Sequence, residues 1–246
     1  MMNNLVLITS AFYTNYGIYS SKERINQTIK TIQSAKKYIP NAFIILIDNS
    51  KEEIKKDTSI ELKNLLNSVG YYIDNSMDSD IKYFHTNVVN YDIGKNAMEA
   101  IGLYKGLIHI ANSSDLSNIL KNSLRIFKLS GRYQITKEFN FNNFNNDNTK
   151  NKFVFKKSQP SWIPIEHTGV TYQLQTRLWS FDSELMFYVI NMYKNIIENM
   201  IATFNNRMYI DNEHSMAKFI PKELLVEIDK VGVQGNIAPN GMMIID

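Results

Sequence analysis

Short runs made almost entirely of apolar and β-branched residues restrict this chain to a small group of folds. Leu5 to Thr9 is one such run, and Ala42 to Ile47 is a second. A strand that is apolar at every position is typical of a sheet covered on both faces. Between the two runs, from Lys22 to Tyr38, apolar residues recur at the spacing of one helix face. We therefore predict a strand–helix–strand unit, whose right-handed crossover makes the two strands parallel.

The same alternation continues along the chain. The predicted fold class is α/β: a mainly parallel, Rossmann-like sheet flanked by helices, with a less regular C-terminal half. The further helices are expected at 54–69, 95–111 and 115–120, near 185–196 and after residue 211, and the further strands at 71–73, 124–129 and 153–155, within 173–180 and at 224–228.

The length and composition are those of one domain. A chain of 246 residues, 44% of them hydrophobic, can bury a sizeable core, so a single domain spanning 1–246 is expected. Residues 139–152 contain seven Asn and show neither helical nor strand periodicity. We predict a flexible Asn-rich loop there. It separates an N-terminal half, 1–138, from a C-terminal half, 153–246.

Charge and cysteine content exclude several classes of partner and site. The 27 basic and 24 acidic residues are interspersed, which predicts no nucleic-acid partner. Cysteine is absent and the four histidines lack paired spacing, so no disulfide or dedicated zinc site is expected. No signal peptide is recognisable, and no apolar run approaches the roughly 20 residues of a membrane-spanning helix. We expect a cytoplasmic protein without a transmembrane segment; peripheral contact with a membrane stays open.

Three loops follow predicted strands and are expected to meet at one edge of the sheet, where ligands of open α/β sheets bind. They are Thr9 to Phe12, Asp48 to Ser50, and Ser130 to Tyr133. The Asp48 carboxylate suits a ribose hydroxyl or a base N–H. Capping of a helix or turn explains Asp48 equally well.

The segment Lys128-Leu-Ser-Gly-Arg-Tyr133 combines a strand end, a glycine and two cations. Gly131 permits close backbone approach, and Lys128 and Arg132 suit a diphosphate. A turn with a surface Arg is the alternative. Lys95 stands near a predicted helix start and also suits phosphate; the alternative is an i, i+4 ion pair with Glu99.

Acidic residues cluster at two further places. Asp211-Asn-Glu-His214 lies at a predicted helix start, where Glu213 or Asp211 is a candidate general base. Capping by Asp211 and an ordinary core role for His214 compete with that interpretation. Asp78-Ser-Asp80 has the spacing of a divalent-cation motif, but we interpret it as solvated loop charge.

On these segments, about the first 140 residues resemble the nucleotide-binding half of GT-A glycosyltransferases, especially bacterial and viral surface-polysaccharide enzymes with a Lys-x-Ser-Gly-Arg-Tyr segment. The resemblance implies a nucleotide-sugar donor, and we take UDP or GDP as its nucleotide. It also implies a glycan or lipid-linked acceptor bound by the C-terminal half. It implies that Glu213, and second Asp211, acts as the catalytic base. It places the donor at Thr9, Ser10, Ala11 and Asp48 for the base and ribose, and at Lys95, Lys128, Gly131 and Arg132 for the diphosphate.

The chain departs from that family at one point. GT-A enzymes commonly carry a metal-binding D-x-D after the fourth strand, where this chain has Ser130 to Tyr133. Dependence on Mg²⁺ or Mn²⁺ is therefore open, and we hypothesise that a cation such as Arg132 neutralises the leaving diphosphate in place of the metal ion. Two other functions also stay open: a nucleotidyltransferase, although no Gly-rich phosphate loop follows the first strand, and a non-catalytic carbohydrate-binding protein. The oligomeric state is not predicted.

Overall fold

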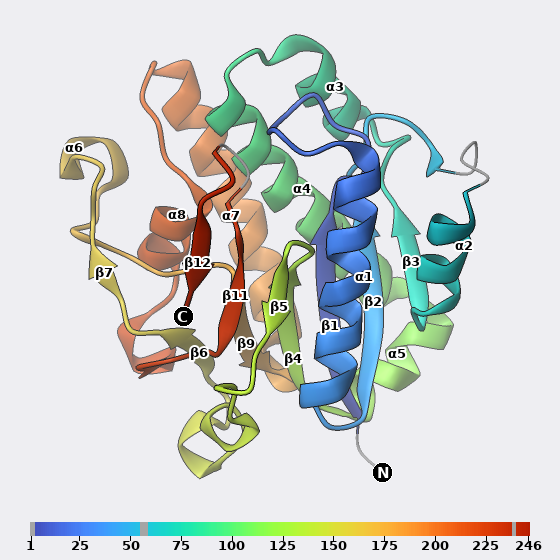
Figure 1. Ribbon diagram of the computed structural model, residues 1–246. Coiled ribbons are helices and arrows are strands. Elements are labelled where there is room, and N and C mark those ends of the chain that lie inside the picture. The colour runs from blue at the N-terminus through green and yellow to red at the C-terminus, as the bar shows by residue number, and fades with distance from the viewer. Residues whose placement is uncertain (1–2, 55–58, 238–239) are drawn as a thin grey trace.

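A seven-stranded sheet runs through the centre of the protein (Figure 1). The computed structural model describes residues 3–54, 59–237 and 240–246. Strand order in the sheet is β10-β6-β9-β4-β1-β2-β3. The strands of this sheet are β1 (Asn3–Ser10), β2 (Ala42–Asp48), β3 (Tyr71–Asp74), β4 (Ser123–Ser130), β6 (Phe153–Lys156), β9 (Leu178–Asp182) and β10 (Leu225–Ile228).

Most strand pairs are parallel. β1 pairs in parallel with β2 and β4, β2 with β3, and β6 with β10; β9 is antiparallel to both β4 and β6. The predicted α/β fold with a mainly parallel sheet is therefore confirmed. Because β1, β2 and β4 run in the same direction, the loops after Ser10, Asp48 and Ser130 lie at one edge of the sheet.

Helices cover both faces of the sheet, as Figure 1 shows. Two small sheets accompany them: β5 (Tyr133–Ile135), β11 (Val233–Asn236) and β12 (Met243–Ile245) form one, and β7 (Gln159–Pro160) and β8 (Tyr172–Gln173) form the other. None of the helices in the described part of the chain is long and apolar enough to cross a membrane. The helices are α1 (Ser21–Tyr38), α2 (Ile60–Asn67), α3 (Ser79–Asn87), α4 (Tyr91–Asn112), α5 (Ser114–Lys121), α6 (Ile165–Thr168), α7 (Met186–Asn205) and α8 (Asn212–Phe219), with short 3-10 helices at Phe141–Asn143, Asp147–Thr149, Ser183–Leu185 and Lys222–Leu224.

The core has two layers because successive side chains of a strand point to opposite faces. Leu5 and Leu7 of β1 join the cluster formed with α4, α5, α7 and α8. Val6 and Ile8 join the cluster formed with α1 and α2. Both layers are apolar, which explains why β1 reads as a continuous apolar run in the sequence.

Several element boundaries differ from the predicted ones. The polar stretch around Asp78 begins α3, which the sequence pattern did not predict; Asp78 caps it, and Ile81 and Phe84 bury its inner face. α4 begins at Tyr91 because Asn90 caps it. Residues 55–58 of the predicted helix at 54–69 lie outside the described residues, and α2 covers only 60–67. In 173–180, only the two ends belong to strands.

The Asn-rich segment 139–152 is folded against the sheet. It contains two 3-10 helices, and Phe144 is fully buried and stacks on Phe139 at a ring distance of 5.1 Å. The buried Arg125 guanidinium donates to Thr149 O at 3.1 Å and to Lys152 O at 3.0 Å. The segment therefore has more local structure than its composition suggested, because aromatic side chains between the Asn residues reach the core; its flexibility stays a prediction.

Candidate functional site

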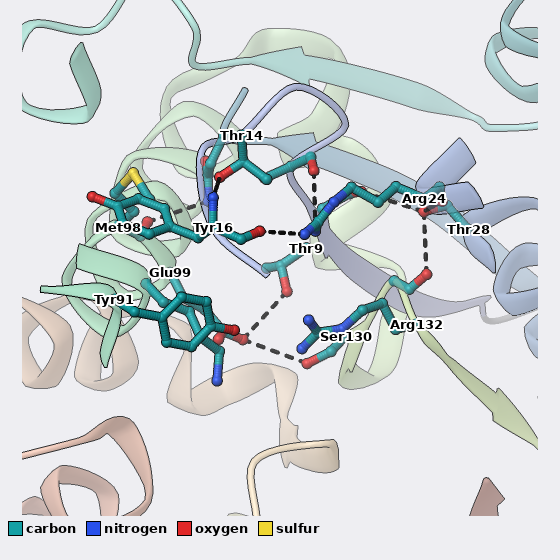
Figure 2. A pocket seen from close by; sticks show the side chains of 15 residues that line it. Thr9, Thr14, Tyr16, Arg24, Thr28, Tyr91, Met98, Glu99, Ser130 and Arg132 are labelled. Carbon is teal, nitrogen blue, oxygen red and sulfur yellow. Dashed lines mark hydrogen bonds between the residues drawn. The ribbon is translucent and has the colours of Figure 1, made fainter. Parts of the chain in front are cut away.

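A cavity opens at the carboxyl ends of β1 and β4, between the first turns of α1 and α4 (Figure 2). Six of the predicted site residues line it, and they come from three segments far apart in the sequence. The parallel direction of β1 and β4 brings two of these segments together, as the sequence pattern predicted. The six residues are Thr9, Ser10, Ala11, Lys95, Gly131 and Arg132.

Gly131 joins the two strand ends. Its N–H donates to Thr9 O at 2.8 Å, and its carbonyl accepts from Thr28 Oγ1 at 3.1 Å. A Cβ at this position would lie 3.0 Å from both Thr9 O and Thr28 Oγ1, which is tighter than an ordinary contact. The close backbone approach predicted for this glycine is confirmed, and it lets the chain turn so that Arg132 faces the cavity.

Arg24 of α1 also lines the cavity, although the sequence pattern did not indicate it. Only 7% of Arg24 is exposed, and its guanidinium donates to the carbonyls of Tyr19, Ala11 and Tyr16 rather than to a carboxylate. Burial, and then the charge of Arg132, lowers the pKa of Arg24 to about 10. The two guanidinium groups are therefore close enough to repel each other.

Lys95 and Arg132 have no carboxylate partner within the described residues. Figure 2 shows Arg132 and Arg24 on the same side of the cavity. Three cations thus face one space without forming an ion pair to any carboxylate in the described part of the chain. Bringing like charges together costs free energy, and a bound anion would recover it.

Glu99 is the single carboxylate among the described lining residues, and it is already paired. Its partner is the ammonium group of Lys128, which is 2% exposed and also donates to Ser130 Oγ at 2.9 Å and Thr176 O at 3.2 Å. Burial alone would raise the pKa of Glu99, but the charges of Lys128 and Lys95 outweigh it and lower the pKa to about 2.

This pairing corrects two predictions. Lys128 was expected to bind a diphosphate, but its side chain is buried beneath the cavity lining. Its ammonium group forms an ion pair with Glu99 instead. The alternative for Lys95, an ion pair with Glu99, is also wrong, since the ion pair of Glu99 is with Lys128. Lys128 lies on the same face of β4 as Ile126. Because α4 covers this face, the Lys128 side chain points into the protein interior.

Asp48 does not reach the cavity either. It is fully buried, and its Oδ1 accepts a hydrogen bond from the Phe12 N–H at 3.2 Å. Burial raises the pKa of Asp48 to about 7 against opposing hydrogen bonds from Ser50 and Phe12. The predicted contact with ribose or base is not available to this side chain. It holds the loop after β1, and the neighbouring Asn49 lines the cavity.

Aromatic rings form one wall of the cavity. Tyr16 and Tyr91 meet edge to face at 5.8 Å, and Tyr16 stacks on His85 at 5.9 Å. The Tyr16 hydroxyl lies 2.9 Å from Phe84 O and 2.6 Å from Val88 O, either of which can accept its hydrogen, and the ring packs between α3 and α4. Tyr91 is partly exposed in the same wall, so the cavity offers a ring face beside its cations.

Asp211 and Glu213 lie at the start of α8, outside the cavity lining. Asp211 caps the helix: its Oδ1 accepts from His214 N at 2.9 Å and lies 2.6 Å from His214 Nδ1. Asp211 is 4% exposed, which supports the capping alternative; its role as a second base stays a prediction. His214 is fully buried, as expected of a core histidine.

Glu213 has the properties of a proton acceptor. Its Oε1 accepts a hydrogen bond from Thr176 Oγ1 at 2.6 Å. Burial, and then the nearby charge of Asp211, raises the pKa of Glu213, while Lys95 acts in the opposite direction. Glu213 is therefore within electrostatic range of the cavity residues Lys95 and Glu99. A carboxylate with a raised pKa binds a proton more readily than an ordinary one.

The D-x-D pattern has a structural role. Asp78 caps α3, and both Asp78 and Asp80 pair with Lys105, at 2.9 and 3.1 Å. The interpretation as solvated loop charge was wrong in one respect, because these residues belong to a capped and ion-paired helix start. Within 3–54, 59–237 and 240–246, no group of three or more His, Asp or Glu side chains is arranged to hold a metal ion.

Comparison with known proteins identifies the fold. No protein-family model matches the chain, and no curated protein matches its sequence. Among solved structures, the galactosyltransferase LgtC, in complex with donor and acceptor sugar analogs, has a TM-score of 0.53 at 10% identity, covering 91% of this chain and 72% of that chain. Core-mannan synthase A from Aspergillus fumigatus, in an Mn/GDP form, has a TM-score of 0.52 at 10% identity, covering 98% and 77%.

A mannosyltransferase from S. cerevisiae is similar in the same way, with a TM-score of 0.50 at 10% identity over 93% of this chain and 67% of that chain. The shared feature is the α/β fold with a mostly parallel sheet flanked by helices. The fold implied by the resemblance to GT-A glycosyltransferases is thereby confirmed.

Proposed function

We propose that this protein is a glycosyltransferase that moves a sugar from a nucleotide-sugar donor to a hydroxyl group of a glycan or lipid-linked acceptor. The observation that carries the proposal is a set of three cations, Arg24, Lys95 and Arg132, at the carboxyl ends of β1 and β4, which form no ion pair with any described carboxylate. Nucleotides bind at this edge of open α/β sheets. We place the reaction in the cytoplasm, in surface-polysaccharide or glycoconjugate synthesis, with a UDP- or GDP-sugar as donor.

The three cations suit the leaving group of such a reaction. When the bond between the anomeric carbon and the phosphate oxygen breaks, negative charge grows on the diphosphate. Fixed cations at that position stabilise the transition state more than the ground state. The guanidinium of Arg132 and the ammonium of Lys95 would contact the phosphate oxygens. The ring wall at Tyr91 would lie beside the base or ribose.

A divalent metal ion does not fit this donor set. Mg²⁺ and Mn²⁺ prefer several oxygen ligands, usually carboxylates. Glu99 is the carboxylate that the described cavity offers, and Lys128 neutralises it. A metal ion next to Glu99 would also meet the charges of Lys95 and Arg132. We therefore propose that these cations neutralise the diphosphate without a metal.

Glu213 would act as the base in a direct displacement. The acceptor oxygen attacks the anomeric carbon, its proton passes to the Glu213 carboxylate, and the nucleoside diphosphate leaves with the electron pair of the broken bond. This course inverts the configuration at the anomeric carbon. The hydrogen bond from Thr176 Oγ1 orients the carboxylate for the transfer.

Thermal-shift measurements with nucleoside diphosphates test the proposal. A ligand that binds only the native state raises the melting temperature. We expect UDP or GDP to raise it in the presence of EDTA, and uridine or guanosine to have a much smaller effect. Arg132→Met should weaken diphosphate binding about tenfold or more, since a charge-assisted hydrogen bond contributes about 1.5–3 kcal/mol. Lys30→Met, at an exposed position of α1, is the matched control.

Three results would contradict the proposal at different levels. Absence of a shift with every nucleotide would leave the non-catalytic carbohydrate-binding protein as the better function. Release of pyrophosphate from a nucleoside triphosphate and a sugar 1-phosphate would identify a nucleotidyltransferase. Loss of turnover with EDTA and its recovery with Mn²⁺ would refute the metal-free mechanism alone.

A further inference from the structure

Trp162 is a large apolar side chain that is exposed at the surface, while the residues on either side of it are fixed by a hydrogen bond and by burial. It lies between β7 and α6, and 65% of it is exposed. The adjacent Ser161 N–H donates to Thr171 O at 2.9 Å, and the next residue, Ile163, is 5% exposed. A Trp is buried in most proteins, and a fixed, exposed indole ring is typical of a binding surface.

Two buried residues, His214 and Asp211, connect Trp162 to the start of α8. The indole ring meets the ring of His214 edge to face at 5.9 Å. His214 Nε2 lies 2.8 Å from Ser161 Oγ, and its Nδ1 lies 2.6 Å from Asp211 Oδ1. His214 therefore ties the segment before Trp162 to the same helix turn that carries Glu213.

A second neighbour of Trp162, Tyr209, connects the indole ring to a helix that lines the cavity. The Tyr209 ring lies 6.3 Å from the indole ring, and the Tyr209 hydroxyl accepts a hydrogen bond from Asn96 Nδ2 at 2.9 Å. Asn96 follows the cavity residue Lys95 in α4 and also accepts from Asn212 Nδ2. Trp162 is therefore linked to α4, which lines the proposed donor site, through the Tyr209 ring and its hydrogen bond from Asn96. In Figure 1, α6 and α8 lie on the same side of the molecule.

We infer that Trp162 is the stacking platform for a sugar ring of the acceptor, which makes the acceptor a saccharide. This inference rests on the proposed function. One face of a pyranose ring carries mainly C–H groups, and packing this face on the indole removes apolar surface from water on both partners. The ring hydroxyls stay at its edge, where one of them can point toward Glu213 at the start of α8.

The surroundings favour a saccharide over a protein or lipid occupant. The groups that contact the indole, Tyr209 and His214, carry polar atoms committed to hydrogen bonds, so the exposed apolar surface next to Trp162 is small and includes Ile165, which is 49% exposed. A stable protein interface needs on the order of 800 Å² per partner. The indole ring also lies 5.9 Å from the ring of His214, the residue that follows the proposed base Glu213 in α8.

Tryptophan fluorescence tests the inference, because the chain has two Trp residues and the other, Trp179, is fully buried. The probes are methyl β-galactopyranoside, methyl α-mannopyranoside and methyl β-glucopyranoside, titrated with and without UDP or GDP. We expect at least one probe to change the emission saturably. By NMR, Trp162→Ala should weaken that binding about tenfold, and Trp162→Tyr should retain it. Phe187→Ala, at a position 70% exposed on α7, is the matched control.

The inference is overturned if no probe binds, or if Trp162→Ala and the unchanged protein bind the probe equally. It is also overturned if sedimentation shows a dimer that Trp162→Ala dissociates, since the ring would then belong to a protein interface. The nucleotide-induced thermal shift should be the same in Trp162→Ala and the unchanged protein. Saccharide binding without any nucleotide binding would refute the proposed function while supporting a saccharide site at Trp162.

Discussion

Replacing Glu99 with Gln should destabilise the protein by about 3 kcal/mol, because it leaves the ammonium of Lys128 buried without a carboxylate. Lys128 is 2% exposed, and removal of one partner of a buried pair typically costs about 3–5 kcal/mol. The pKa of Glu99 agrees with this magnitude. It lies at about 2, below the ordinary 4.5, and this difference corresponds to about 3 kcal/mol at neutral pH. We expect the lower end of the range because Lys128 keeps two hydrogen bonds, to Ser130 Oγ and Thr176 O.

Urea unfolding of a double-mutant cycle measures the effect. The cycle comprises Glu99→Gln, Lys128→Met and the double variant, and Glu198→Gln on the exposed face of α7 is the control. We expect the double variant to be more stable than the sum of the single changes predicts, because it leaves no charge unpaired. Since folding lowers the pKa of Glu99, its contribution is present above about pH 4.5 and is lost as the pH falls toward 2.

Additive effects in the cycle, or a loss below about 0.5 kcal/mol for Glu99→Gln, would refute the reasoning. The same variant also tests the electrostatics of the cavity. Because Glu99 is the carboxylate among the described lining residues, Glu99→Gln should not weaken binding of a nucleoside diphosphate in protein that remains folded. Weaker binding would show that Glu99 itself contributes to the ligand site.

The other predictions concern Asp48, Glu213 and Phe144. Folding raises the pKa of Asp48 to about 7, so the free energy of unfolding should fall as the pH rises from about 4 to 7; urea unfolding across this range should show that Asp48→Asn removes that dependence. Glu213→Gln should lower the transfer rate about 10²–10⁴-fold in a radiolabelled-donor assay without weakening donor binding, and the wild-type rate should fall as the pH drops through the raised pKa of Glu213. Phe144→Ala should cost about 3–5 kcal/mol in urea unfolding, whereas the exposed Phe187→Ala should cost little; equal costs would mean that the Asn-rich segment does not pack as described.

Local patterns in the sequence were enough to predict most of the sheet and its helices. Continuous apolar runs such as Leu5 to Thr9 can only be buried on both faces, and helical spacing between such runs produces parallel strands. The edge at which ligands bind follows from strand direction, so Thr9 to Ala11 and Gly131 to Arg132 could be placed in one cavity before the structure was seen. The packing of 139–152 was not predicted, because the prediction relied on the Asn-rich composition and not on the Phe residues that reach the core.

Polar side chains were harder to assign, because their direction depends on the elements packed against them. Arg24 reaches the cavity from α1, where it shares a buried face with Thr28 and Thr31; that spacing was the signal available in the sequence. Trp162 gave no signal, since exposure of an aromatic ring is a property of the folded surface.

The sequence by itself determined most of the strands and helices and the edge of the sheet where the loops meet. The strands and helices follow from periodicities of neighbouring residues, and the edge follows from the direction of the strands. Only the tertiary structure decided which charges face that edge. Lys128 lies near the end of β4 and is covered by α4, so it neutralises Glu99; Asp48 ends β2 and is covered by the loop after β1, so it binds the Phe12 N–H. Among the described residues, Lys95 and Arg132 form no ion pair with a carboxylate, and Glu99, the carboxylate in the described lining, is already paired with Lys128.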